Sequence, residues 1–158
     1  MILFFDEDMG TAIPRFLRGA DRDVDVRWLR AQFPNESDPR RQDVEWLAEA
    51  GRQGWLVISC NKRMLSVIYE RQAILQHKVG IVYFASGQVG RLPMMRALLR
   101  KWDWLKAADL SEPRPFAYYL YASGRTRQLS LETRRVPIQG PESAGANCPT
   151  PGRADRGM

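Results

Sequence analysis

The sequence has few of the residues that several common kinds of site require. It contains one histidine, His77, and two cysteines, Cys60 and Cys148. A single histidine excludes metal sites built from several histidines and argues against a histidine-based catalytic triad. Two cysteines give neither a disulfide framework nor a zinc-binding pattern. No apolar run approaches the roughly 18 residues of a transmembrane helix, so none is predicted.

The N-terminal residues also lack the basic segment and the small-residue cleavage site of an export signal. The low cysteine content suits the reducing interior of a cell. We therefore expect a cytoplasmic protein that does not contact a membrane.

The length and composition predict one folded domain. The chain has 158 residues, of which 44% are hydrophobic, and this is sufficient for a sizeable core. We expect the domain to occupy residues 1–135. Residues 136–158 are rich in proline and glycine and poor in large apolar side chains, so we expect a disordered tail.

The formal net charge is +6. From Pro137 onward two arginines balance two acids, so the excess positive charge belongs to the folded part. A basic domain favours a polyanionic partner such as a nucleic acid, although the charge alone does not identify one.

The chain is organised around its first ten residues. Residues 1–5 are apolar, and the acids Asp6, Glu7 and Asp8 follow them directly. Five consecutive apolar residues predict a strand that is buried on both faces of a parallel sheet, and the carboxyl edge of such a sheet is where α/β folds bind ligands. Adjacent carboxylates repel one another unless a cation or a basic group neutralises them. The segment is thus either a metal site or a solvated turn whose acids favour the next helix.

Apolar periodicity predicts that strands and helices alternate along the rest of the chain. We therefore expect a three-layer α/β/α domain with a mostly parallel central sheet and a C-terminal hairpin. The expected strands are 1–5, 23–29, 55–60, 78–85, 116–122 and 128–131, and the expected helices are 11–18, 41–53, 63–77 and 90–107.

Two more oxygen donors are expected at the same edge of the sheet. Asp43 falls in the first turn of the helix 41–53, three and four residues before Trp46 and Leu47, which places it at the border of the buried face. Asn61 follows the strand 55–60. Carboxylate and amide oxygens suit Mg²⁺ or Mn²⁺ rather than zinc. The alternatives are that Asp43 interacts with the helix dipole and that Asn61 is a turn residue.

These segments resemble the PIN-like domain family, nucleases related to the toxins of VapBC-type toxin–antitoxin modules. The resemblance rests on FFDEDMG, on DVEWLAEAGRQGWLVISCNKRM and on the helix with YERQAI. It covers residues 1–85 and extends more loosely to Leu131. In that family an acid ends the first strand, a second acid opens a helix and one or two aspartates follow the third strand. Asp6, Asp43 and Asn61 match these positions, and Asp8 stands where the family often has another polar ligand.

The resemblance implies a metal-dependent endoribonuclease that hydrolyses RNA phosphodiester bonds. It also implies a toxin whose protein partner is a cognate antitoxin, and a homodimer is a further candidate assembly. Mg²⁺ or Mn²⁺ bound by Asp6, Asp8, Asp43 and Asn61 would polarise the scissile phosphate and activate water. Asp6, Asp43 and Asn61 are the expected catalytic residues.

Asn61 and Arg63 depart from the family pattern, because related sequences usually carry acids there. An amide can bind Mg²⁺ but contributes no charge. The alternative is therefore a catalytically impaired module that binds RNA or a protein. A phospho-acceptor signalling domain is disfavoured, since it needs an aspartate where this chain has Asn61.

Five basic side chains are candidates for RNA binding. Two directly follow Asn61, where phosphate contact and ordinary surface charge explain them equally well. The other three lie on the helix 90–107, which is basic and carries two tryptophans, and which could bind a single strand by charge and stacking. For Trp102, a place in the core is the simpler explanation. The candidates are Lys62, Arg63, Arg96, Arg100 and Lys101.

Overall fold

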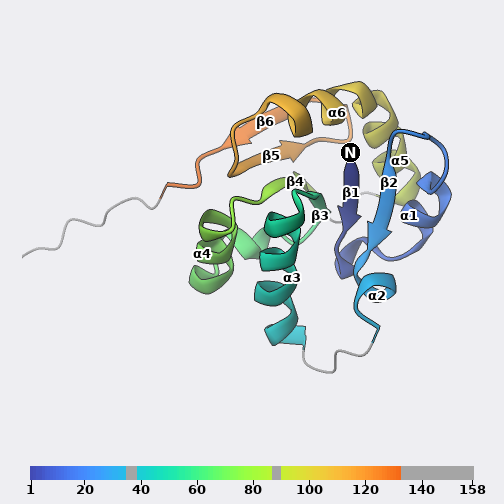
Figure 1. Cartoon of the computed structure of the whole chain (residues 1–158). Coiled ribbons are helices and arrows are strands. Elements are labelled where there is room, and N and C mark those ends of the chain that lie inside the picture. The colour runs from blue at the N-terminus through green and yellow to red at the C-terminus, as the bar shows by residue number, and fades with distance from the viewer. Residues whose placement is uncertain (35–38, 87–89, 133–158) are drawn as a thin grey trace, which may run out of the picture.

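A six-stranded sheet forms the centre of the computed structural model, which describes residues 1–34, 39–86 and 90–132 (Figure 1). The strand order is β2-β1-β3-β4-β5-β6. Adjacent strands from β2 to β5 are parallel, and β6 is antiparallel to β5. The strands are β1 (Ile2–Phe5), β2 (Asp25–Trp28), β3 (Leu56–Ser59), β4 (Gly80–Phe84), β5 (Phe116–Leu120) and β6 (Thr126–Leu129).

This topology confirms the predicted α/β fold with a mostly parallel sheet and a C-terminal hairpin. The predicted tail, residues 136–158, lies outside the described residues, and the domain limits therefore stay a prediction. None of the described helices combines the length and the apolar character that crossing a membrane requires.

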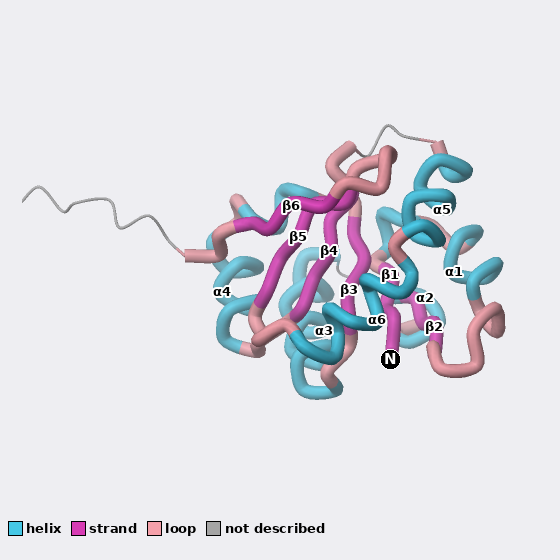
Figure 2. The backbone as a smooth tube through the Cα atoms, turned by 90° about the horizontal axis from the view of Figure 1, so that it is seen from above, coloured by secondary structure: helices cyan, strands magenta, loops and turns pink. Residues whose placement is uncertain are grey.

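Helices cover both faces of the sheet and complete three layers (Figure 2). One face packs against α2 (Leu29–Gln32), α3 (Pro39–Gln53), the short 3₁₀ helix η2 (Lys62–Leu65) and α4 (Ile68–Gln76). The other face packs against the 3₁₀ helix η1 (Glu7–Met9), α1 (Ala12–Leu17), α5 (Arg91–Arg100) and α6 (Trp102–Ser111). Each face has its own apolar core, which we call the α3 face and the α5 face.

The two cores explain the unbroken apolar run at the N-terminus. Leu3 and Phe5 are buried in the core of the α5 face, and Phe4 between them is buried in the core of the α3 face. The Phe4 ring stacks on Trp55 with centroids 4.9 Å apart and lies 5.4 Å from Trp46. Because successive strand residues point to opposite faces, a strand covered on both sides needs apolar residues at every position.

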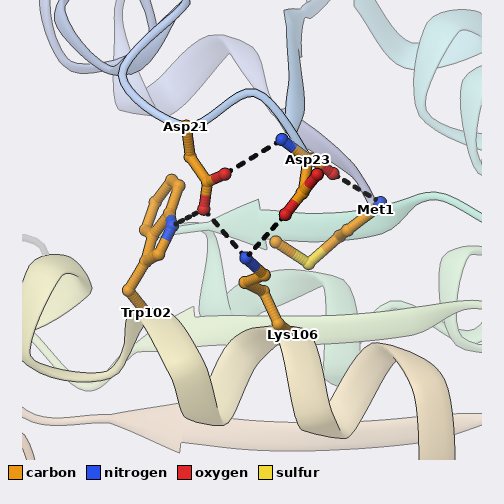
Figure 3. A network of polar contacts seen from close by, with 5 residues as sticks. All are labelled: Met1, Asp21, Asp23, Trp102 and Lys106. Atoms are coloured by element: carbon orange, nitrogen blue, oxygen red, sulfur yellow. Dashed lines mark hydrogen bonds and ion pairs between the residues drawn. The ribbon is translucent and has the colours of Figure 1, made fainter.

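Two predicted helices are interrupted. The segment 63–77 contains η2 and then α4, and the segment 90–107 contains α5 and α6, which meet at Lys101. The Lys101 N–H is shared between the carbonyls of Ala97 and Leu98, both at 3.1 Å, so the α5 turn closes there. The next helix, α6, is anchored to the loop before β2, because the Trp102 indole donates to Asp21 at 2.8 Å (Figure 3).

Several predicted boundaries were also wrong. α3 begins at Pro39 rather than at residue 41, in keeping with the preference of proline for the first helical position. Strand β6 spans Thr126–Leu129 rather than residues 128–131. The hairpin turn closes early, because Gly124 adopts a positive φ of 86° and the Tyr121 N–H donates to the carbonyl of Arg125 at 2.9 Å.

Candidate functional site

The four predicted metal-site residues line one cleft at the carboxyl edge of the sheet. This cleft has a volume of about 210 Å³ and lies on the α3 face, where β1 and β3 end. We call it the acid cleft. It is lined by Asp6, Glu7, Asp8, Leu29, Asp43, Asn61 and Met64. The parallel register of β1 and β3 brings Asp6 and Asn61 to the same edge, and α3 adds Asp43.

Asp6 is the most firmly positioned of these side chains. Only 4% of it is exposed, and its backbone N–H continues the pairing with β3 by donating to Ile58 at 3.2 Å. Its carboxylate accepts the Met9 N–H at 3.2 Å and the hydroxyl of Ser59. The pKa of Asp6 is raised to about 7. Burial is the main cause, the charge of Asp8 adds to the rise, and the Ser59 hydrogen bond opposes it.

Ser59 is a site residue that the sequence analysis missed. It is fully buried at the end of β3, donates to Asp6, and accepts the Asn61 N–H at 2.9 Å. Ser59 therefore connects the predicted ligand of β1 to the turn that carries Asn61. The signal was a hydroxyl residue inside the apolar run WLVISC, where a buried polar group needs partners.

Asn61 serves the turn that was predicted as its alternative role. Its side-chain oxygen accepts the Arg63 N–H at 3.2 Å and thereby caps η2. A carbonyl oxygen has two lone pairs, so this hydrogen bond leaves one for a ligand in the acid cleft. The residue can thus combine capping with metal binding.

Asp43 lies in the second turn of α3, which corrects the predicted first-turn position, because the helix begins earlier. Its Oδ1 accepts the indole N–H of Trp46 at 3.0 Å. Burial raises the pKa of Asp43, the Trp46 hydrogen bond opposes this rise, and the charges of Asp8 and Glu7 add to it. Asp43 is therefore placed by a buried indole and faces the other acids.

Glu70 is the second residue that the sequence analysis missed. It belongs to α4, is only 7% exposed, and no donor among the described residues reaches its Oε2. Burial raises its pKa, as does Asp43, whose carboxyl group is within hydrogen-bonding contact. Glu70 precedes Ala73 and Ile74 by three and four residues, the same spacing to buried positions that singled out Asp43.

The five basic candidates fall into two separate groups. Lys62 and Arg63 lie on η2 beside the acid cleft, and the Lys62 ammonium donates to the Ala85 carbonyl at 2.7 Å. The other three belong to α5 and its last turn, on the opposite face of the sheet. Arg96 and Arg100 are exposed there and Lys101 is half-buried. One bound strand would have to cross the sheet edge to touch both groups.

The donors of the acid cleft suit an oxygen-preferring divalent cation in their chemistry. The charge of Asp43 raises the pKa of Asp6, and the charge of Asp8 raises the pKa of both Asp6 and Asp43, so a cation would relieve the repulsion between these acids. Among the described residues, no three or more His, Cys, Asp or Glu side chains are grouped so that they could hold a metal ion. The four predicted ligands Asp6, Asp8, Asp43 and Asn61 thus line one cleft, and metal binding by them stays a prediction.

The comparisons with known proteins bear on the segment that contains this cleft. A family model described as PIN like domain matches residues 1–86. Neither the curated proteins nor the solved structures gave a match. The matched segment contains β1 to β4, the acid cleft, Ser59 and Glu70. Because more than half of the sequence is matched, the chain belongs to the PIN-like domain family, which indicates a nuclease-type function.

Proposed function

We propose that the protein is a metal-dependent endoribonuclease that hydrolyses RNA phosphodiester bonds. The observation that supports this most is the convergence of Asp6, Asp43 and Asn61 on the acid cleft, where both acids have a raised pKa. When bound, Mg²⁺ or Mn²⁺ would supply positive charge at the scissile phosphate and a bound water of lowered pKa.

The surrounding residues prepare Asp6 for this role. The Met9 N–H and the Ser59 hydroxyl fix both oxygens of its carboxylate, so little side-chain freedom is lost when it binds an ion. Each oxygen retains a lone pair for the ion.

Asp43 provides the second carboxylate from the opposite wall of the cleft. The indole of Trp46 holds one of its oxygens, and the carboxyl group of Glu70 is within hydrogen-bonding reach of it. Lys62 and Arg63 follow the lining residue Asn61 on η2, and they would bind the phosphate of the substrate. Arg96, Arg100 and Lys101 would extend this contact on the α5 face.

The proposal extends to the biological role suggested by the family resemblance, the toxin of a toxin–antitoxin module. An antitoxin would need apolar surface to bind. Large apolar side chains are exposed on α1, α4 and α5, for example Phe16 at 64% and Ile68 at 73%.

Co-expression with a candidate antitoxin should restore growth that the protein alone inhibits, and absence of growth inhibition would contradict the toxin role. Light scattering of the pure chain tests the homodimer.

A second candidate function is a module that binds RNA without cleaving it. The observation that favours it is the capping role of Asn61, which occupies part of the amide oxygen and brings no charge. This candidate shares the RNA partner with the nuclease and differs only in the chemistry.

The two candidates are separated by a cleavage assay on a panel of single-stranded RNAs with Mg²⁺ or Mn²⁺. The nuclease predicts cleavage that Asp6→Asn and Asp43→Asn abolish, whereas Asp103→Asn, an exposed acid on α6, serves as the charge-matched control. RNA binding without cleavage by the wild type would favour the binding module. If the protein neither binds nor cleaves RNA, both candidate functions are contradicted.

A further inference from the structure

A second cleft borders Asp6 on the α5 face of the sheet. It has a volume of about 310 Å³, within the range of pockets that hold small organic ligands. It shares Asp6, Glu7 and Leu29 with the acid cleft, so the two clefts meet at the edge of the sheet. Its other lining residues include Trp28, Arg30 and Arg91.

Trp28 gives this cleft an aromatic wall. It is the last residue of β2 and pairs with Phe5 in the parallel register, so it lies beside the residue that precedes Asp6. Its ring is half-buried against the core of the α5 face. The Arg18 guanidinium lies over the ring, 5.5 Å from its centroid, and a base stacked on that face would take its place. A half-exposed indole at the rim of a cleft can stack on a nucleobase.

Two arginines line the same cleft, whereas no arginine among the described residues lines the acid cleft. Arg91 is the first residue of α5, is exposed, and forms no ion pair with any described residue. Arg30 pairs with Glu7, to which its Nε donates at 2.9 Å, so this pair is close to neutral and Arg91 supplies the free positive charge of the cleft among the described residues. A phosphate near Arg91 would therefore meet a positive field next to Asp6.

We call this second cleft the Trp28 cleft. We infer that it holds the nucleotide next to the scissile phosphate, with the base stacked on Trp28 and the phosphate bound by Arg91 and Arg30. This inference rests on the proposed nuclease function, because the acid cleft would hold the scissile phosphate itself. The strand would cross the sheet edge at Asp6, from the α3 face to the α5 face. The inference favours a single-stranded substrate, since a base inside a duplex would first have to be unpaired and unstacked to reach the indole.

The test measures the binding of fluorescein-labelled six-nucleotide RNAs by the full chain carrying Asp43→Asn, which prevents cleavage. In this background, Trp28→Leu should weaken binding about tenfold, the loss of one base stack. Arg91→Ala should weaken binding and lower the slope of log affinity against log salt by about 0.7. Arg22→Ala, another exposed arginine outside the Trp28 cleft, should leave affinity unchanged.

An RNA with one abasic position, moved along the strand, identifies the stacked base. At one position the abasic RNA should bind the Trp28→Leu protein and the parent protein equally. Trp28→Phe keeps an aromatic ring and should retain most of the affinity, which separates stacking from loss of packing; thermal unfolding checks that each variant folds.

The outcomes distinguish this inference from the proposed function. If the wild type cleaves RNA but Trp28→Phe, Trp28→Leu and Arg91→Ala bind like Arg22→Ala, the subsite is wrong and the nuclease stands. If binding depends on Trp28 and Arg91 but no metal supports cleavage by the wild type, the subsite is supported and the nuclease is wrong. Equal binding of a duplex and a single strand would overturn the stacking of the base.

Discussion

Ser59, on β3, donates its hydroxyl hydrogen to the carboxylate of Asp6, which lies 53 residues earlier at the end of β1. The same hydroxyl oxygen accepts the N–H of Asn61. One buried serine thus orients the first acid of the cleft and the turn that carries the neutral donor.

We predict that Ser59→Ala destabilises the fold by about 1–3 kcal/mol, because it removes the partner of one buried oxygen of Asp6 and of the Asn61 N–H. The loss also raises the pKa of Asp6 further, so Mn²⁺ should bind more weakly at pH 7. Urea unfolding and Mn²⁺ relaxation measure the two effects. Ser111→Ala, which removes an exposed hydroxyl on α6, is the control. Unchanged Mn²⁺ affinity would show that Ser59 does not support the ligand.

The raised pKa of Asp6 predicts a pH dependence of stability in the metal-free protein. Below about pH 4 both the folded and the unfolded state hold the proton, and Asp6 has no effect. As the pH rises from 4 to 7 the unfolded state ionises first, so the free energy of unfolding falls, by about 4 kcal/mol at most. Asp6→Asn should remove this fall and stabilise the protein at pH 8. Denaturant unfolding between pH 4 and 8 measures this fall in the free energy of unfolding. If the fall persists in Asp6→Asn, it is caused by groups other than Asp6.

Glu70 and Asp43 also predict a stability that falls as the pH rises. Both acids have a raised pKa, and their carboxyl groups are within hydrogen-bonding reach of one another. At low pH one carboxyl group can donate a hydrogen bond to the other, whereas at high pH the two carboxylates repel one another. Glu70→Gln keeps the shape and supplies an N–H donor to Asp43. We expect the melting temperature of this variant to exceed that of the wild type at pH 8 and to approach it at pH 5. The exposed acid Glu45 provides the matched control, Glu45→Gln. A decrease at pH 8 would mean that the carboxylate itself is needed for the fold.

A second polar network predicts the opposite pH dependence. Asp21 accepts the Asp23 N–H at 2.9 Å, the Trp102 indole at 2.8 Å and the Lys106 ammonium at 3.0 Å (Figure 3). These hydrogen bonds lower the pKa of Asp21 to about 2. Its stabilising effect is therefore complete above pH 4 and is lost as the pH falls toward 2.

Asp21→Asn should accordingly destabilise the protein at pH 6 and make no difference near pH 2. Acid unfolding followed by circular dichroism compares the two proteins. Asp103→Asn, an exposed acid on the same helix as Lys106, provides the control. Equal stability at pH 6 would show that the network contributes nothing.

The strands and the acid cleft were predictable because they depend on local pattern. An unbroken apolar run marks a strand with two covered faces, and parallel strands necessarily bring the residues that follow them to one edge. Asp6, Asp43 and Asn61 reach the same cleft for that reason.

Features that depend on contacts between distant segments could not be predicted. The helix break at Lys101 accompanies the hydrogen bond of Trp102 to Asp21, on a loop 81 residues away. Glu70 meets Asp43 only because α3 and α4 pack on the same face. The Trp28 cleft depends on the pairing of Trp28 with Phe5, and no local pattern specifies that register.

Asn61 offers the last prediction, because it separates the nuclease from the binding module. Asn61→Asp keeps the cap of η2, since aspartate accepts the Arg63 N–H equally well. It adds a negative charge to a cleft that already holds Asp6 and Asp8, so the metal-free protein should lose stability. In the presence of metal the added charge becomes favourable. A gain of about 1.4 kcal/mol would mean tenfold tighter Mg²⁺ binding, measurable by calorimetry.

The effect on cleavage then identifies the role of the amide. If Asn61 is a weakened ligand, Asn61→Asp should raise cleavage of single-stranded RNA at subsaturating Mg²⁺, and adding Asp6→Asn should abolish the gain. If the amide orients the attacking water instead, the variant should bind metal more tightly and cleave more slowly. Absence of cleavage by both proteins in Mg²⁺ and in Mn²⁺, with RNA bound, would contradict the nuclease. If Asn61→Asp binds metal more tightly, binds RNA and still does not cleave it, the protein is an RNA-binding member of a nuclease family whose lost chemistry involves more than the neutral residue after β3.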